Sequence, residues 1–265
     1  MLPPPLRFAT FLAPRLLPVY ASVARHIGAR LGVPAELVVG TGYDGVASQA
    51  HVSFLCGLAY VELVEAGEPL EAVAAPLLQG GRYGGRPVYF SDVIVRRDSP
   101  FRRFADLRGR SWSYNEPRSH SGYGVTRYRL VELGETAGFF GAVVEAGWHE
   151  RSIRLVHAGE VDASAVDSHV LAVALRDHPE LAAGLRVIDS FGPSTVQPAV
   201  VASWLPGPLK AAVRTALATM ADEPAGRAAL ARGMVERFVP VTDSSYDDLR
   251  RMRAACAAAG FLTLR

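Results

Sequence analysis

Hydrophobic residues in the first eighty positions alternate between two periodicities. Residues 6–11 show the two-residue period of a strand, and residues 15–31 show helical spacing of apolar positions up to a Gly-Val-Pro stop. The alternation continues, with strands expected at 36–39, 52–55 and 70–77 and helices at 44–49 and 58–65. Repeated strand and helix units of this kind predict an α/β fold with a parallel sheet covered by helices on both faces.

Two long extended runs interrupt this alternation, and each follows a glycine-containing break. The runs span 88–96 and 197–203, after breaks at 80–87 and 191–195. We interpret them as two crossings between lobes, with residues 1–90 and 198–265 forming lobe I and 91–197 forming lobe II. Lobe II is expected to have strands at 111–114, 163–166 and 185–189 and helices at 122–133, 152–157 and 169–176. Amphipathic helices are expected at 209–220, 225–234 and 246–259.

Composition narrows the classes of function. The chain has 28 basic and 26 acidic residues, so it lacks the broad positive charge of a nucleic-acid-binding surface, and any anion must be recognised locally. No run reaches the roughly 18 apolar residues of a membrane-spanning helix, so we expect no membrane insertion. No export signal is visible, so the location is left open and a cytoplasmic one is possible. Cys56 and Cys256 form no metal-ligand or redox motif, so no metal, cofactor or disulfide is expected.

Polar residues gather where the strand at 111–114 gives way to the next helix. Ser119, His120, Ser121 and Gly122 stand at this junction. The first N–H groups of a helix have no partner inside the helix, and the helix dipole adds about half a positive charge there, so an oxyanion is well matched to the position. Gly122 would let a ligand approach the backbone closely. Simple helix capping by a serine is the alternative interpretation.

His149 and Asp167 stand at two comparable positions. His149 lies at a loop-to-helix junction, where it either donates to a ligand oxygen or caps a turn. Donation to a dianion would raise the pKa of His149 above about 6.5 and weaken binding at higher pH. Asp167 follows an apolar strand, where ligands lie in open parallel sheets. It would accept a hydrogen bond from a protonated phosphoryl oxygen, a hydroxyl or an amine, unless Asp167 or Ser168 caps the next helix.

Motifs of covalent catalysis are missing from the sequence. The chain has no G-x-S-x-G elbow, no H-E-x-x-H pair, no P-loop and no dinucleotide-binding glycine fingerprint. A triad of serine, His149 and Asp167 can be assembled on paper, but nothing in the spacing indicates an activating geometry. We therefore expect no catalytic residues and favour ligand capture.

Seven segments, in chain order, resemble the phosphonate, phosphite and phosphate substrate-binding components of ABC transporters. They are residues 89–95, 98–100, 104–109, 115–123, 147–149, 159–168 and 237–243. The resemblance implies the type II periplasmic-binding-protein fold, an α/β fold with two mixed or parallel sheets flanked by helices and two crossing strands. It also implies a small oxyanion held in a cleft between the lobes, and an ABC permease as partner.

The resemblance implies which residues line that cleft. The headgroup would lie at Ser119 to Gly122, with an aromatic neighbour and a family histidine beside it. Acidic residues are frequent in the family near 168–169 and at 197, and Ser or Thr is common at 120, so this chain's departures weaken the case for an amine-bearing phosphonate. The expected ligand-binding set is Tyr89, Ser119, His120, Ser121, Gly122, His149, Asp167 and Gln197.

Two other functions share the implied fold. One is a cytosolic enzyme of the menaquinone or thiamine-precursor type acting on a small acidic metabolite, in which His120, His149 or Asp167 would do acid–base work. The other is a ligand sensor that signals through lobe closure. Both stay open on the sequence alone.

Overall fold

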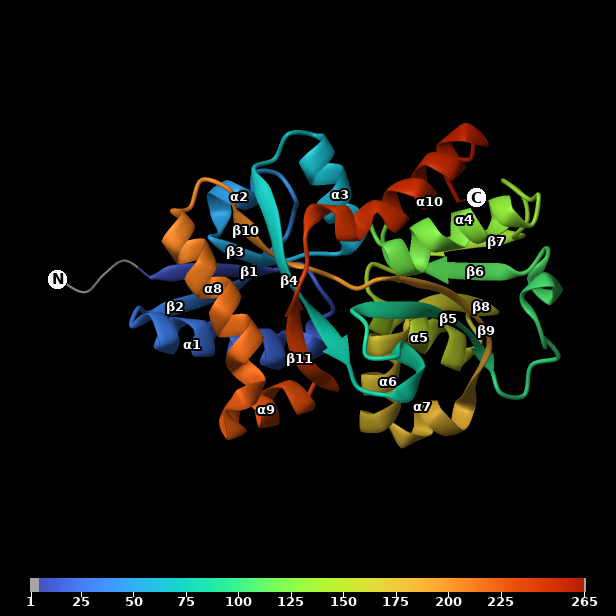
Figure 1. Cartoon of the computed structure of the whole chain (residues 1–265). Helices are drawn as coiled ribbons and strands as arrows, with labels where there is room; N and C mark the ends of the chain where they lie inside the picture. The colour runs from blue at the N-terminus through green and yellow to red at the C-terminus, as the bar shows by residue number, and fades with distance from the viewer. Residues whose placement is uncertain (1–4, 265) are drawn as a thin grey trace. The chain divides into compact units, whose positions relative to one another are not determined.

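The chain forms two compact α/β units in the computed structural model, which describes residues 5–264. The first unit contains the described residues up to Val88 together with Thr195–Asp247. The second contains Tyr89–Ser194 and the residues from Asp248 onward. Each unit has its own sheet and its own helices, so each is described separately below (Figure 1).

A six-stranded sheet forms the centre of the first unit, in the order β11-β4-β10-β3-β1-β2. β1 pairs in parallel with β2 and β3, whereas β10 runs antiparallel to β3 and β4, and β11 runs antiparallel to β4. The strands are β1 (Leu6–Thr10), β2 (Ala35–Val39), β3 (Val52–Phe54), β4 (Leu70–Leu78), β10 (Ala199–Ala202) and β11 (Val235–Pro240). The sheet is therefore mixed, and its two antiparallel additions, β10 and β11, come from the later part of the chain.

Helices lie on both sides of this sheet, with α8 and α9 on one side and α2 and α3 on the other (Figure 1). The α-helices are α1 (Leu17–Leu31), α2 (Val46–Gln49), α3 (Gly57–Glu65), α8 (Gly207–Thr219) and α9 (Pro224–Ala231). Short 3-10 helices are η1 (Pro14–Leu16), η2 (Gly81–Tyr83), η5 (Met220–Asp222) and η6 (Asp243–Tyr246). The positive φ of Gly32, +67°, ends α1 at the glycine of the Gly-Val-Pro stop.

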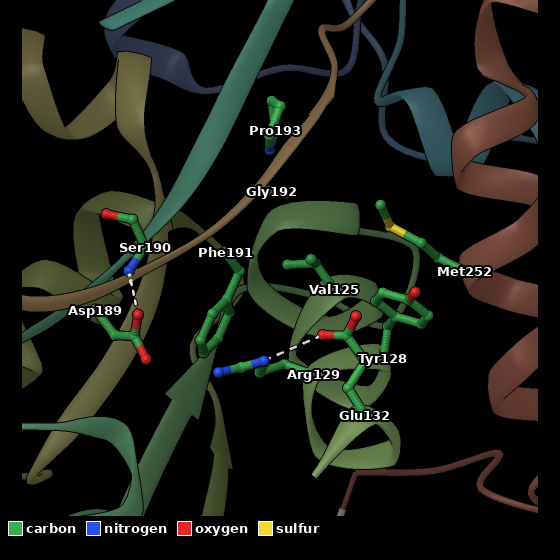
Figure 2. Close-up of a pocket in the computed structure, with 10 residues that line it drawn as sticks. All are labelled: Val125, Tyr128, Arg129, Glu132, Asp189, Ser190, Phe191, Gly192, Pro193 and Met252. Atoms are coloured by element: carbon green, nitrogen blue, oxygen red, sulfur yellow. Dashed lines mark hydrogen bonds and ion pairs between the residues drawn. The ribbon is translucent and has the colours of Figure 1, made fainter.

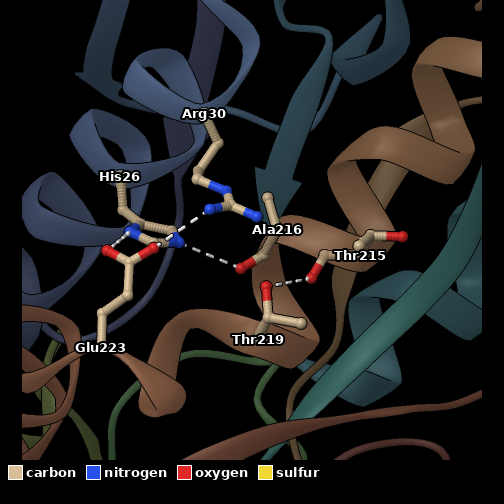
Figure 3. Close-up of polar contacts among 6 residues, drawn as sticks. All are labelled: His26, Arg30, Thr215, Ala216, Thr219 and Glu223. Atoms are coloured by element: carbon tan, nitrogen blue, oxygen red, sulfur yellow. Dashed lines mark hydrogen bonds and ion pairs between the residues drawn. The ribbon is translucent and has the colours of Figure 1, made fainter.

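Helix α1 contacts α8 and the segment after it through a polar cluster (Figure 3). His26 Nε2 lies 3.2 Å from the Ala216 carbonyl oxygen, and His26 Nδ1 lies 3.8 Å from Glu223. Arg30 Nη1 completes the cluster 3.3 Å from the Glu223 carboxylate. Because Arg30 and Glu223 are about half exposed, their ion pair contributes little, and burial of apolar residues such as Ile27 provides most of the stabilisation.

A five-stranded sheet forms the centre of the second unit, in the order β7-β6-β8-β5-β9. β6 pairs in parallel with β7 and β8, whereas β5 runs antiparallel to β8. The strands are β5 (Val88–Arg96), β6 (Ser111–Tyr114), β7 (Ala142–Glu145), β8 (Ala163–Asp167) and β9 (Leu185–Thr195). The helices are η3 (Phe104–Leu107), η4 (His120–Gly124), α4 (Val125–Glu132), α5 (His149–Ala158), α6 (Ser168–Asp177), α7 (Pro179–Gly184) and α10 (Asp247–Ala258).

Alternation along β5 divides the core of the second unit into two clusters. Val93 and Val95 pack with aromatic residues that include Trp112 and Phe104, whereas Ile94 packs with residues of α5 and α6. Successive side chains of a strand point to opposite faces, so one apolar run supplies both clusters. The long apolar run at 88–96 is therefore a strand buried on both faces.

The structure confirms the expected α/β class, with two mixed sheets flanked by helices. Among the strands and α-helices, β7, α7 and β11 are the ones that the sequence patterns did not indicate. β7 is an edge strand whose residues are largely exposed, so it lacks the apolar alternation that would reveal it. The predicted position of the ligand stays a prediction.

The C-terminal segment differs from the sequence-based division, which placed 198–265 in lobe I. Residues from Asp248 onward group with the second unit. Arg127 of α4 donates to the carbonyl oxygens of Phe261 and Leu262, at 3.1 and 2.6 Å, and the Leu264 N–H donates to the Tyr123 hydroxyl at 3.1 Å. The buried Arg127 thus fixes residues 261–262 against α4. Helical periodicity alone does not predict this long-range contact.

Candidate functional site

The helix start after β6 has an unusual backbone. Residues His120–Gly124 form a π-helix that continues into α4, and Ser119 is its N-cap. Ser119 Oγ accepts a hydrogen bond from the Gly122 N–H at 3.3 Å, so Ser119 does cap the helix. Single π turns are rare and frequently occur at functional sites, because the wider turn changes the directions of side chains and N–H groups.

Two serine hydroxyls converge at this helix start. Ser119 Oγ and Ser121 Oγ lie 3.4 Å apart, and each side chain is 3% exposed. Ser121 Oγ also lies 2.9 Å from His149 Nε2, which brings the first residue of α5 to the same place. Ser119, Ser121, Gly122 and His149 are called the candidate anion site from here on.

His149 is buried and neutral at ordinary pH. Burial lowers its pKa, and the carboxylates of Asp167 and Glu150 oppose that shift only in part. The pKa expected to rise when His149 donates to a bound dianion thus starts from a lowered value, and that rise stays a prediction. His149 Nδ1 is buried without a hydrogen-bond partner in either tautomer, and an orphaned buried N–H donor is rarer in proteins than an orphaned acceptor. The tautomer with hydrogen on Nε2, donated to Ser121, is favoured.

Asn115, the first residue after β6, was not in the expected ligand-binding set. A Cβ on residue 122 would lie 2.2 Å from Asn115 Oδ1, so the carboxamide rests directly on the Gly122 backbone. The Asn115 carbonyl oxygen accepts from the Gly147 N–H at 2.7 Å, two residues before His149. Asn115 therefore contacts both Gly122 at the helix start and Gly147 in the loop before His149. The signal for Asn115 was its place at the end of a strand.

His120 points into the second unit's interior. Its Nε2 lies 3.0 Å from Ser194 Oγ, and its ring packs edge-on to Tyr89 with centroids 6.4 Å apart. Burial, aided by the charge of Arg127, lowers the pKa of His120 to about 4. Tyr89 and His120 are each 1% exposed, so the structure places this expected pair in contact with one another inside the second unit.

Asp167 and Gln197 do not belong to the helix start that carries the two serines. Asp167 caps α6, accepting from the N–H groups of His169 and Val170 at 2.7 and 3.2 Å, as the capping alternative anticipated. Its charge still acts on His149. Gln197 belongs to the first unit, between β9 and β10.

The candidate anion site contains hydrogen-bond donors but no formal cation. Serine hydroxyls, backbone N–H groups and a neutral imidazole line it. Arg127, which follows the π-helix, is buried in α4 and donates to backbone carbonyls. Recognition of an anion at this place would depend on the helix dipole and on directional hydrogen bonds.

Other kinds of site receive no support within residues 5–264. No group of three or more His, Cys, Asp and Glu residues is arranged to hold a metal ion. No helix there is both long enough and apolar enough to cross a membrane. Cys56 and Cys256 are buried and are not joined by a disulfide.

A separate pocket of about 370 Å³ lies in the second unit (Figure 2). Residues of α4, β9 and α10 line it. The Phe191 side chain lies between Asp189 and α4, and the Arg129 guanidinium pairs with the Glu132 carboxylate at 3.3 Å. A second, more open pocket of about 490 Å³ is lined by Arg96, Arg97, Asp98, His157, Ala183 and Gly184. Neither pocket is lined by a residue of the expected ligand-binding set.

The family follows from comparison of the whole sequence. Residues 9–246 match the family of ABC transporter, phosphonate, periplasmic substrate-binding proteins, which is most of the chain. The chain belongs to this family, as the ordered segments in the sequence indicated. Members are substrate-binding proteins, which confirms the expectation that this chain is not an enzyme and sets aside the biosynthetic-enzyme alternative.

Solved structures show the same fold. A phosphonate transporter binding protein from Pseudomonas aeruginosa has a TM-score of 0.81 at 18% identity, with 94% of this chain and 85% of that chain covered. PhnD1 from Prochlorococcus marinus, in complex with methylphosphonate, has a TM-score of 0.83 at 14% identity, with 95% and 98% covered. The aliphatic sulphonate binding protein SsuA from Escherichia coli has a TM-score of 0.62 at 15% identity, with 97% and 88% covered. These TM-scores establish the type II periplasmic-binding-protein fold.

Proposed function

We propose that this protein captures a small oxyanion of the phosphonate, phosphite or phosphate class for an ABC-type uptake system. The observation that carries the proposal is the pair of buried hydroxyls, Ser119 and Ser121, at the start of a helix and 3.4 Å apart. Family membership supports the same class of ligand. The relative from Prochlorococcus marinus, which has the same fold, binds methylphosphonate.

The chemistry of the site supports a tetrahedral oxyanion. Such an anion presents several acceptor oxygens in different directions, and the helix start offers donors of two kinds, hydroxyls and backbone N–H groups. Gly122 lets the Asn115 side chain lie directly against the helix start, because any larger residue would place its Cβ 2.2 Å from Asn115 Oδ1. His149 fixes the position of the Ser121 hydroxyl through the contact of its Nε2 with Ser121 Oγ.

The roles of the remaining expected residues follow from their contacts. Tyr89 and His120 pack against each other inside the second unit, and we propose that they support the helix start from there. Asp167 is proposed to act through its charge on His149 rather than by a direct charge–charge contact with the ligand. Gln197 is proposed as a ligand neighbour on the family resemblance alone. An ABC permease is the proposed macromolecular partner, on the basis of the family.

Isothermal titration calorimetry with Ser121→Ala tests this function. We expect wild-type protein to bind methylphosphonate, phosphite or phosphate, and the variant to lose about ten- to a hundredfold in affinity, because a hydrogen bond to a charged acceptor disappears. Equal affinity in the variant would show that Ser121 only shapes the helix start and would contradict the proposed site.

A further inference from the structure

Asn115 carries a buried oxygen whose hydrogen-bonding capacity is unused. The side chain is 8% exposed, and among the described residues Asn115 Oδ1 is one of the buried polar atoms without a partner. Leaving a buried acceptor unsatisfied is unfavourable, so such an atom in a native structure requires an explanation. Its backbone is fixed on both sides, by β6 and by the hydrogen bond from Gly147.

This oxygen lies beside the candidate anion site. It occupies the space over the Gly122 backbone, and Gly122 donates its N–H to Ser119 while its neighbour Ser121 contacts His149. A ligand held by the Ser119 and Ser121 hydroxyls would lie at the same helix turn as this acceptor. An unprotonated oxygen of the ligand would be repelled by the Asn115 oxygen, whereas a P–OH group would donate to it.

We propose that Asn115 is a specificity-determining residue that selects oxyanions carrying a proton. Its carboxamide oxygen accepts a hydrogen bond from the P–OH group of a phosphonate or phosphite monoanion. A sulfonate of the same tetrahedral shape has no such hydrogen at ordinary pH, so it leaves the acceptor unpaired and is discriminated against. This inference rests on the proposed function, and it names the protonation state and the class of oxyanion that the site accepts.

Two ligands of matched shape, methylphosphonate and methanesulfonate, test the proposal by calorimetry on the full chain. Wild-type protein is expected to bind methylphosphonate at least about tenfold more tightly at about pH 6, the ratio that an unpaired buried acceptor typically produces. The methylphosphonate affinity is expected to decrease toward about pH 9, because loss of the second phosphonate proton removes the donor.

Two nearly isosteric variants move the selectivity in opposite directions. Asn115→Leu removes the acceptor, so we expect the ratio to fall below about threefold and the pH dependence to flatten. Asn115→Asp replaces the amide by a carboxylate, which repels an unprotonated oxygen more strongly, so the ratio is expected to increase. Thermal melting checks that each variant is folded, and Asn115→Asp provides a test if Asn115→Leu does not fold.

The outcomes separate this inference from the proposed function. Equal binding of the two ligands by wild-type protein would overturn the inference while leaving oxyanion capture intact, because Asn115 would then present its amide N–H. An unchanged ratio in both variants would overturn it as well. Binding of neither ligand, together with no binding of phosphite or phosphate, would contradict the proposed function itself and this inference with it.

Discussion

Ser121 Oγ lies 2.9 Å from His149 Nε2, and both side chains are buried. The neutral imidazole carries one hydrogen, and its position decides the direction of this bond. With the hydrogen on Nε2, His149 donates to Ser121 and leaves the serine hydrogen for a ligand oxygen. His149 thus acts through Ser121 as a positioning residue.

Replacement of His149 tests this arrangement. A glutamine can place an amide N–H near the position of Nε2, whereas a leucine cannot donate. We expect His149→Gln to keep anion affinity within about threefold of wild type and His149→Leu to lose about tenfold, measured by calorimetry. Equal affinities for the two variants would contradict the positioning role.

Ser119 and Ser121 differ in their expected contributions. Ser119 Oγ already accepts from the Gly122 N–H and retains one hydrogen to donate, whereas Ser121 is fixed by His149. We expect Ser119→Ala to lose both anion affinity and about 1 kcal/mol of unfolding free energy, since the cap is lost. Ser48→Ala, at an exposed serine of α2, is the matched control and should change neither quantity by more than the error of calorimetry and urea unfolding. A loss of stability in Ser119→Ala with wild-type affinity would assign Ser119 to capping alone.

Gly122 and Asn115 should be energetically coupled. Gly122→Ala places a methyl group 2.2 Å from Asn115 Oδ1, so we expect a destabilisation of roughly 1–3 kcal/mol in urea unfolding. In the background of Asn115→Ala the same change should cost much less, because the opposing carboxamide is removed. A double-mutant cycle measures this coupling, and additive effects would show that the contact is unimportant.

Stability should decrease in acid because of the buried histidines. The pKa of His120 is about 4 in the folded protein and near 6.5 when exposed, so the unfolded chain takes up the proton first. The contribution is complete above about pH 6.5 and diminishes as pH falls toward 4. At about 1.4 kcal/mol per pKa unit, the loss is roughly 3 kcal/mol.

Urea unfolding between about pH 7 and pH 4.5 measures this effect. His120→Gln, which can retain a contact with Ser194, should have a flatter pH profile than wild type. His149 titrates in the same direction, so part of the slope will remain in the variant. A profile unchanged by His120→Gln would show that His120 is not the group responsible.

The sequence predicts most strands and helices here because burial follows periodicity. The run at 88–96 and the helical spacing at 15–31 correspond to β5 and α1, whose apolar positions are buried. Edge strand β7 is largely exposed, so its residues carry no such pattern. The π-helix at His120–Gly124 depends on how its turn is packed, and no residue periodicity encodes it.

The candidate site was predictable in part. Serines and a glycine before a helix indicate an anion site by backbone chemistry alone, which identified Ser119, Ser121 and Gly122. The contact between Ser121 and His149 joins residues 28 positions apart, and the orphan oxygen of Asn115 depends on the close approach to Gly122. Long-range contacts of this kind come from packing, which a single sequence does not display.

Calorimetric titration of the wild-type protein with a panel of small anions tests the central claim most directly. The panel consists of methylphosphonate, aminoethylphosphonate, phosphite, phosphate and sulfate. We expect at least one phosphorus oxyanion to bind with a dissociation constant of about 1 µM or tighter, and sulfate to bind more weakly. Binding of none of the phosphorus oxyanions, with stabilisation of the fold by aromatic carboxylates or pyrimidines instead, would contradict the account.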